Sequence, residues 1–208
     1  MITAVADSGT DRRHRILHEA LRLFAEHGYE GTGMRAVAEA AGCRQSTLYH
    51  YFPNKDAIME ALIESAAERK FRAIDKARPD WSLREMLFRV GRSFLSSMAK
   101  PEARWLLQVI LEAAQHHPAW GQQYLDELYD APNEVLASWI AAKLPPSASA
   151  HVNPRWVAET FIGALFSFVL HEQILRRSAE ALPSEAFLAQ QVEVVTRGLT
   201  ALASTDVS

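Results

Sequence analysis

The residues best suited to chemistry lie together between Arg44 and Lys55, in the stretch RQSTLYHYFPNK. Their side chains carry guanidinium, amide, hydroxyl, imidazole and ammonium groups next to aromatic rings. Such groups bind phosphate oxygens and the edges of bases in a DNA groove. The chain has no nucleophile elbow, P-loop or metal-binding cluster, so we expect no enzyme.

Two short helices must position these groups. The first has small or apolar residues at helical spacing: Met34, Val37, Ala38 and Ala41. Gly42 follows and suits the left-handed turn that ends a helix. The second helix runs from Gln45 to Tyr51 and is broken at Pro53. Two short helices joined by a tight turn with glycine are typical of a helix-turn-helix, whose second helix lies in the DNA major groove.

The pattern of the second helix predicts which side chains are available to DNA. Leu48 is its apolar anchor to the rest of the domain. The polar residues around it are expected to face outward or along the groove: Arg44, Gln45, Ser46, Thr47, Tyr49 and His50. Tyr51 and Phe52 are expected in the core instead.

The rest of the chain also shows helical periodicity, so the predicted fold is all-α. One helix ends at Gly28, and another begins at Lys55 and runs to about Ala77. A proline and a capping serine in ARPDWS, residues 77–82, predict a domain boundary. The later helices are expected at 83–98, 102–116, 120–143, 154–177 and 184–203, with a loop at 144–154. The predicted domains are 11–71, with the DNA-binding motif at about 33–52, and 82–203.

Composition limits the remaining possibilities. Of 208 residues, 49% are hydrophobic and 23% charged, and the net charge is −3, so any attraction to DNA must be local. The one cysteine, Cys43, suits a reducing cytoplasm and is expected to act as a small buried hydrophobe; a redox role is the alternative. The N-terminus lacks the order of a signal peptide, and the apolar run 161–170 is too short to span a bilayer. We therefore expect a cytoplasmic protein with no membrane partner.

The stretch GYEGTGMRAVAEAAGCRQSTLYHYFPNKDAIMEAL resembles the DNA-binding segment of the TetR family of transcriptional regulators. The resemblance covers about residues 12–72, and TLYHYFPNK after AEAAG is its most specific part. It implies a three-helix DNA-binding domain, a linking fourth helix and a C-terminal helical domain that dimerises and binds an effector. The stretch VILEAAQHHPAWGQQYLDELYDAP is more weakly similar to the C-terminal domain of AcrR- and AefR-like repressors.

The resemblance implies roles for single residues. Gln45 and Ser46 match the variable positions of the recognition helix, where the DNA sequence is chosen. Arg35 and His50 match positions that reach either a base or a phosphate. Phosphate contacts are implied for three residues: Thr47, Tyr49 and Lys55.

The sequence also departs from the family pattern. Gly33 stands where the family usually has Ser or Thr, so a helix cap and a phosphate hydroxyl are missing, and Thr32 is expected to replace them. Arg44 adds a charge in the turn, where we expect it to contact DNA. The DRRHR stretch, residues 11–15, is either a charged first turn or an arm that attracts phosphates.

The C-terminal half predicts a homodimer. The segment ETFIGALFSFVLHEQIL is apolar nearly all round, which indicates burial on more than one face. With the helix 184–203 it is expected to form a four-helix bundle with a second copy. The expected interface residues come from both helices: Phe161, Leu165, Phe166, Val169, Val192, Val195 and Leu199.

An effector pocket is predicted from the aromatic residues of this half, although aromatic residues also build ordinary cores. The candidates combine aromatic and polar side chains: Trp105, Glu112, His116, Trp120, Tyr124 and His171. Glu112 and His116 lie four residues apart on one predicted helix face and could bind a metal together with His171. No second closely spaced pair of ligands accompanies them, so we expect no metal and no cofactor.

The function predicted from these patterns is a repressor that binds a palindromic operator on double-stranded DNA and is released by a small apolar or aromatic molecule. The alternative function is that of a helical module that binds a small molecule but does not bind a specific DNA sequence. The intact RQSTLYHY stretch with Lys55 argues against that alternative.

Overall fold

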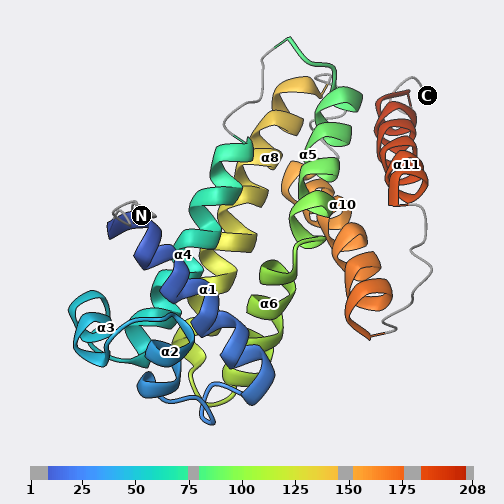
Figure 1. Ribbon diagram of the computed structural model, residues 1–208. Coiled ribbons are helices and arrows are strands. Elements are labelled where there is room, and N and C mark those ends of the chain that lie inside the picture. Colours follow the sequence, from blue (N-terminus) through green and yellow to red (C-terminus); the bar gives the residue numbers. More distant parts are fainter. Residues whose placement is uncertain (1–8, 75–79, 145–151, 176–183, 205–208) are drawn as a thin grey trace, which may run out of the picture. The chain divides into compact units, whose positions relative to one another are not determined.

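The computed structural model describes residues 9–74, 80–144, 152–175 and 184–204, and every regular element in these ranges is a helix (Figure 1). The all-α prediction is therefore confirmed for the described residues. No helix among them is long and apolar enough to cross a membrane.

The chain forms two compact units that are not consecutive in sequence. Unit one comprises Met1–Ala67 and Pro101–Leu125, and unit two comprises Glu68–Lys100 and Asp126–Ser208. Residues 101–125, expected in the C-terminal domain, thus cluster with the N-terminal helices. The predicted boundary at 77–82 lies mostly outside the described residues and stays a prediction.

Unit one contains the predicted DNA-binding motif. Its helices are α1 (Gly9–His27), α2 (Met34–Ala40), α3 (Gln45–Tyr51), the first part of α4 (Lys55–Ile74), α6 (Pro101–Ala113) and α7 (Pro118–Tyr124). The apolar stripe of α1 is fully buried at Ile16, Ala20 and Phe24, and α6 packs along α1. This packing brings α6 and α7 into unit one.

Unit two is a bundle of longer helices. They are α5 (Leu83–Met98), α8 (Ala131–Lys143), α10 (Pro154–Val169) and α11 (Ser184–Ser204), with the second part of α4. Helix α10 packs against α5, α8 and α11. At Gly91 of α5 a β-carbon would lie 3.1 Å from the Phe161 ring and closer still to the end of the Leu188 side chain, so a larger residue would require these side chains to shift.

Two predicted helices are interrupted by π-helical turns. The expected helix 120–143 is α7, a π-helical turn at Leu125–Asp130 and then α8. Pro132 stands at the start of α8 and has no N–H to donate, which disturbs the hydrogen bonding of the preceding turn. The expected helix 154–177 is α-helical only to Val169 and continues as a π-helical turn, Leu170–Leu175. Residues 176 and 177 lie outside the described residues.

The predicted dimer interface needs a correction. Most of its residues are core residues of the protomer, at most 7% exposed: Phe161, Leu165, Val169, Val192 and Leu199. Phe166 is half-buried, and half-buried Val195 packs against the buried pair Val152 and Leu199. Because α10 is surrounded by three helices of its own chain, its all-round apolar sequence reflects burial inside the protomer. The prediction is wrong for the five core residues.

Candidate nucleic-acid interface

A glycine turn and one buried leucine set the position of α3. Gly42 has a φ of 64°, the left-handed conformation expected for it, and the Cys43 N–H donates to the Ala38 carbonyl at 3.0 Å. Leu48 is fully buried and is the one buried residue of α3. The helix is therefore fixed along one side, and its other faces are available.

The available faces carry the predicted DNA-contacting side chains. Arg44, Gln45, Ser46 and His50 are exposed, Tyr49 is 46% exposed, and Thr47 is half-buried. Phe52 is buried, as expected for a core residue, whereas Tyr51 is only half-buried. The structure thus gathers guanidinium, amide, hydroxyl, imidazole and phenol groups on one short helix, where a groove of DNA can reach them.

Arg35 lies on the exposed surface of α2. Its Nε donates to the Glu39 carboxylate at 2.9 Å, one helical turn further on. This hydrogen bond raises the pKa of Arg35 above its ordinary value. A phosphate would have to compete with Glu39 for the guanidinium, so the contact stays a prediction.

Thr32 does not have the predicted role. It is 2% exposed, and its hydroxyl points inward, where the carbonyls of Gly28, at 2.9 Å, and Leu23, at 3.2 Å, share its one proton. Gly33 occupies the N-cap of α2, which has no side-chain cap. The hydroxyl is needed to satisfy the end of α1, so the predictions of a cap and of a phosphate contact at Thr32 are wrong.

Lys55 begins α4 next to the turn that follows α1. Its Nζ donates to the Tyr29 carbonyl at 2.8 Å, lies 4.3 Å from the centre of the Tyr29 ring and is 3.8 Å from a Glu30 carboxylate oxygen. An ammonium has three donors, so these contacts leave capacity for a phosphate. The predicted phosphate contact stays a prediction, and the structure adds an anchoring role.

Tyr29 is a residue that the sequence reasoning missed. Its hydroxyl donates to the Asp56 carboxylate, and its ring packs against Phe24 and Trp120. Burial, followed by the hydrogen bond to Asp56, raises the pKa of Tyr29. An aromatic residue placed directly after the glycine that ends α1 is the sequence signal that would have found it.

The charged start of the chain is helical. Residues 11–15, left open above as a first turn or an arm, lie in the first turns of α1. The Arg13 guanidinium lies 5.4 Å from the centre of the Phe52 ring. This placement fits a charged first turn.

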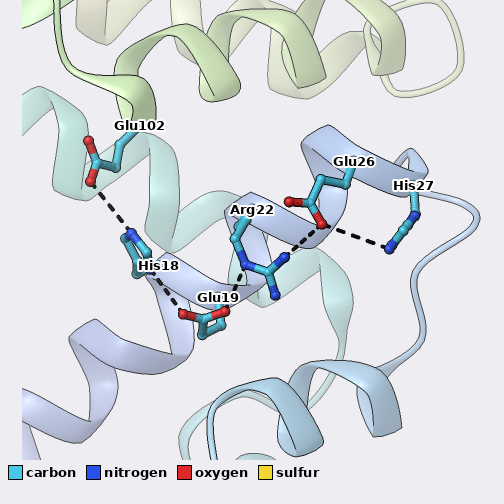
Figure 2. A network of polar contacts seen from close by, with 6 residues as sticks. All are labelled: His18, Glu19, Arg22, Glu26, His27 and Glu102. Atoms are coloured by element: carbon cyan, nitrogen blue, oxygen red, sulfur yellow. Dashed lines mark hydrogen bonds and ion pairs between the residues drawn. The ribbon is translucent and has the colours of Figure 1, made fainter.

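A network of polar contacts joins α1 to α6 (Figure 2). It runs along the outer side of α1 through His18, Glu19, Arg22, Glu26 and His27 and reaches Glu102 of α6. Burial opposes ionisation of Glu19, but hydrogen bonds to Arg22 and His18 outweigh it and lower its pKa. Surface pairs of this kind contribute up to about 1 kcal/mol each, and one of them, between His18 and Glu102, joins α1 to α6.

The two candidate effector tryptophans of unit one have different surroundings. Trp120 is 5% exposed and lies in the core of unit one, with its ring centre 4.7 Å from Tyr29 and 4.0 Å from His117. Trp105 is half-buried, with its ring centre 6.0 Å from that of His18.

The other candidates are divided between the units. Glu112 and His116 of unit one are exposed, and so is His171 of unit two, whose Nδ1 lies 2.8 Å from the Ser167 carbonyl. Burial raises the pKa of Tyr124 to about 12. Among the described residues, no three potential metal ligands gather into a site. The effector site stays a prediction, and the Trp120 ring already packs against Tyr29 and His117.

Two family models match the chain. The model of bacterial regulatory proteins of the tetR family matches residues 16–62, and the model of the AefR-like transcriptional repressor C-terminal domain matches residues 85–200. The second match alone spans more than half of the chain.

Individual relatives agree with these models. The transcriptional regulator YvkB of Bacillus subtilis is 21% identical over 190 residues, covering 90% of this chain and 96% of YvkB. The transcriptional repressor KstR2 of Mycobacterium tuberculosis is 30% identical over 138 residues, covering 65% of this chain and 60% of KstR2. The chain therefore spans less than two thirds of the length of that repressor.

Solved structures share the fold. The flavonoid-responsive regulator FrrA has a TM-score of 0.70 and 22% identity, covering 93% of this chain and 97% of FrrA. The regulator FadR from Bacillus subtilis, in complex with stearoyl-CoA, has a TM-score of 0.68 and 19% identity, covering 89% of this chain and 98% of FadR. With the exposed polar face of α3 and the two matching family models, the chain belongs to the TetR family of bacterial transcriptional regulators.

Proposed function

We propose that the protein is a dimeric repressor that reads a palindromic operator with α3 and is released from it by an apolar effector. The observation that carries the DNA-binding part is the exposed polar face of α3, held in place by buried Leu48 and the turn at Gly42. A helix fixed on one side and polar on the other can enter the major groove without disturbing its own domain. A chromosomal operator would place the protein in the cytoplasm.

The exposed side chains suggest separate roles in binding. Gln45 and Arg44 stand at the start of α3, where side chains of a recognition helix reach base edges. We assign base contacts to these two and to Ser46, and phosphate contacts to Thr47, Tyr49 and Lys55. His50 and Arg35 contact either a base or a phosphate.

A revised dimer surface follows from the burial pattern of unit two. The outward faces of α10 and α11 keep large apolar side chains exposed: Trp156 at 68%, Val194 at 60% and Leu202 at 47%. Apart from the adjoining turns of the same helix, no heavy atom of the described residues lies within 4 Å of the position that a β-carbon would take at Gly163 or Gly198. Exposed apolar side chains next to open glycines allow two helices of a second copy to approach closely, so we place the dimer interface here.

The effector is proposed to be an apolar molecule that carries a hydrogen-bond acceptor. Asn133 of α8 is 1% exposed, and its Nδ2 has no acceptor among the described residues. It shares the buried stripe of α8 with Leu136, Ala137 and Ile140. A buried amide normally has a partner, and a ligand oxygen would supply one. The stearoyl-CoA bound by FadR and the flavonoid response of FrrA support this chemical class.

The alternative is a helical small-molecule-binding module without specific DNA binding. A gel shift with the wild-type protein and a pool of random duplexes separates the two functions. A retained complex that resists competitor DNA supports the repressor, whereas no retention at micromolar protein supports the module. Turnover of a bound small molecule would point to an enzyme instead.

Calorimetry tests the release by effector. A compound that dissociates the complex with DNA is titrated into the protein with and without operator. If the compound prefers the DNA-free state by about 3 kcal/mol, its affinity falls roughly a hundredfold when operator is present. Equal affinity in both titrations would rule out the coupling.

A further inference from the structure

Tyr29 occupies the centre of an aromatic and cationic cluster in unit one. The residue is 5% exposed. Its ring centre lies 5.1 Å from that of Phe24, 4.7 Å from that of Trp120 and 5.4 Å from that of His117, and the Lys55 ammonium lies 4.3 Å away. The ring therefore joins α1, α7 and the start of α4.

The hydroxyl and the backbone carbonyl of Tyr29 both hold the start of α4. Its hydroxyl donates to the Asp56 carboxylate, and its backbone carbonyl accepts from the Lys55 Nζ at 2.8 Å. The ring faces the ammonium, which is attracted to the negative face of an aromatic ring. Three contacts from one residue therefore fix where the Lys55 ammonium lies.

The segment that begins α7 fixes Tyr29 from the other side. The His117 and Trp120 rings are stacked, with centres 4.0 Å apart and planes 17° apart, and both meet the Tyr29 ring nearly edge-on. His117 Nε2 also lies 3.2 Å from a carboxylate oxygen of Glu30. The other carboxylate oxygen of Glu30 lies 3.8 Å from the Lys55 ammonium. A shift of α7 cannot leave the Tyr29 ring in the same place.

We propose that Tyr29 is a positioning residue for the DNA phosphate contact of Lys55, and that His117 and Trp120 control this contact through Tyr29. The inference rests on the phosphate role proposed for Lys55. Helix α7 continues directly into the π-helical turn Leu125–Asp130, along which the chain passes from unit one into unit two. A displacement of Trp120 would therefore act on Lys55 through Tyr29.

A double-mutant cycle tests this route, with the salt dependence of DNA affinity as the readout. Lys55→Gln should reduce the slope of log affinity against log salt by about one unit, the loss of one phosphate contact. Trp120→Leu removes the ring against Tyr29 and should reduce the slope similarly. In the Lys55→Gln protein, Trp120→Leu should cause no further reduction, because it acts through Lys55.

Leu107→Ala is the matched control. Leu107 is also a buried residue of unit one, on α6, but it has no ring to pack against Tyr29. The variant loosens the packing of unit one and should leave the slope at the wild-type value; a reduced slope would mean that general loosening, and not the loss of the Trp120 ring, lowers the slope. If Trp120→Leu does not fold, half-buried His117→Ala takes its place with the same expectation.

Two results would overturn the proposal. The first is a wild-type slope in the Trp120→Leu or His117→Ala protein. The second is that Trp120→Leu reduces the slope by the same amount in the wild-type protein and in the Lys55→Gln protein. A wild-type slope in Lys55→Gln would remove the phosphate role of Lys55 and the positioning role of Tyr29 together. Binding of the wild-type protein to a selected duplex would still support the repressor in that case, so the two failures are distinguishable.

Discussion

Helices α3 and α10 show opposite uses of a helix surface. Helix α3 has seven residues, of which Leu48 alone is buried, and polar groups cover the rest. Helix α10 has sixteen residues and buries six apolar or small ones against three neighbouring helices. One buried leucine anchors α3, so its polar side chains remain accessible to a polar partner. The buried residues of α10 form part of the core of unit two.

The difference shows what an apolar pattern can indicate. An all-round apolar helix indicates burial on several faces but not whether the same chain or a second copy covers them. In α10 the covering elements are α5, α8 and α11 of the same chain. The exposed residues Trp156 and Val194, which are scattered singly in the sequence, identify the outer surface instead.

The largest expected effect concerns the buried face of α10. Leu165→Glu places an unpaired charge at a fully buried position and should destabilise unit two by about 4 kcal/mol or more. Urea unfolding followed by circular dichroism measures this loss. Ser96→Glu on the exposed side of α5 is the control and should change the stability by less than about 0.5 kcal/mol. A stable, folded Leu165→Glu monomer would restore the interface predicted from the sequence.

The next effect concerns the exposed face of α11. Val194→Glu should leave the unfolding midpoint of the protomer nearly unchanged but weaken the dimer by several kcal/mol, because the charge would be buried between copies. Sedimentation at micromolar concentration should show monomers, and affinity for a palindromic duplex should fall with the loss of the second half-site. Wild-type sedimentation of this variant would mean that the dimer surface lies elsewhere.

A smaller effect is expected for one base contact of α3. Gln45→Ala should cost about 1–3 kcal/mol at one base pair of each half-site and make the protein tolerate other bases there. Titration of duplexes with single substitutions gives the cost position by position. Tyr49→Phe serves as the comparison and should weaken binding to all duplexes alike. A uniform loss in Gln45→Ala would reverse the two roles.

The smallest effect concerns the cap of α5. Ser82 and Glu85 form a capping box, in which the Ser82 hydroxyl accepts from the Glu85 N–H and the Glu85 carboxylate accepts from the Ser82 N–H. Ser82→Ala should lower stability by about 1 kcal/mol at neutral pH. The Glu85 carboxylate accepts from the Ser82 backbone and side chain, which lowers its pKa below the ordinary 4.5. Its contribution is therefore present above pH 4.5 and is lost as the pH falls through the lowered pKa. Unfolding at pH 7 and pH 3 should show a smaller difference between the proteins at pH 3.

Much of the fold could be predicted from local signals. The serine cap and apolar spacing fix α5 at 83–98, and Gly28 and Gly42 both adopt the left-handed conformation that ends a helix. These features depend on residues close in sequence. The exposed polar face of α3 follows equally from the single apolar anchor among its polar residues.

The missed features depend on contacts that local sequence does not encode. The inward hydroxyl of Thr32 depends on the carbonyls of Leu23 and Gly28 near the end of α1, and the burial of Trp120 depends on Tyr29, ninety-one positions earlier. The assignment of α6 and α7 to unit one likewise depends on their packing along α1. Spacing within one helix carries no information about such distant partners.

Selection of bound duplexes from a random pool tests the central claim most directly, because α3 in a dimer must read two copies of one half-site. The account predicts enrichment of an inverted repeat whose half-site centres lie one helical turn, about 34–36 Å, or a multiple of it apart. Enrichment of a sequence without two-fold symmetry, or of no sequence, would contradict it.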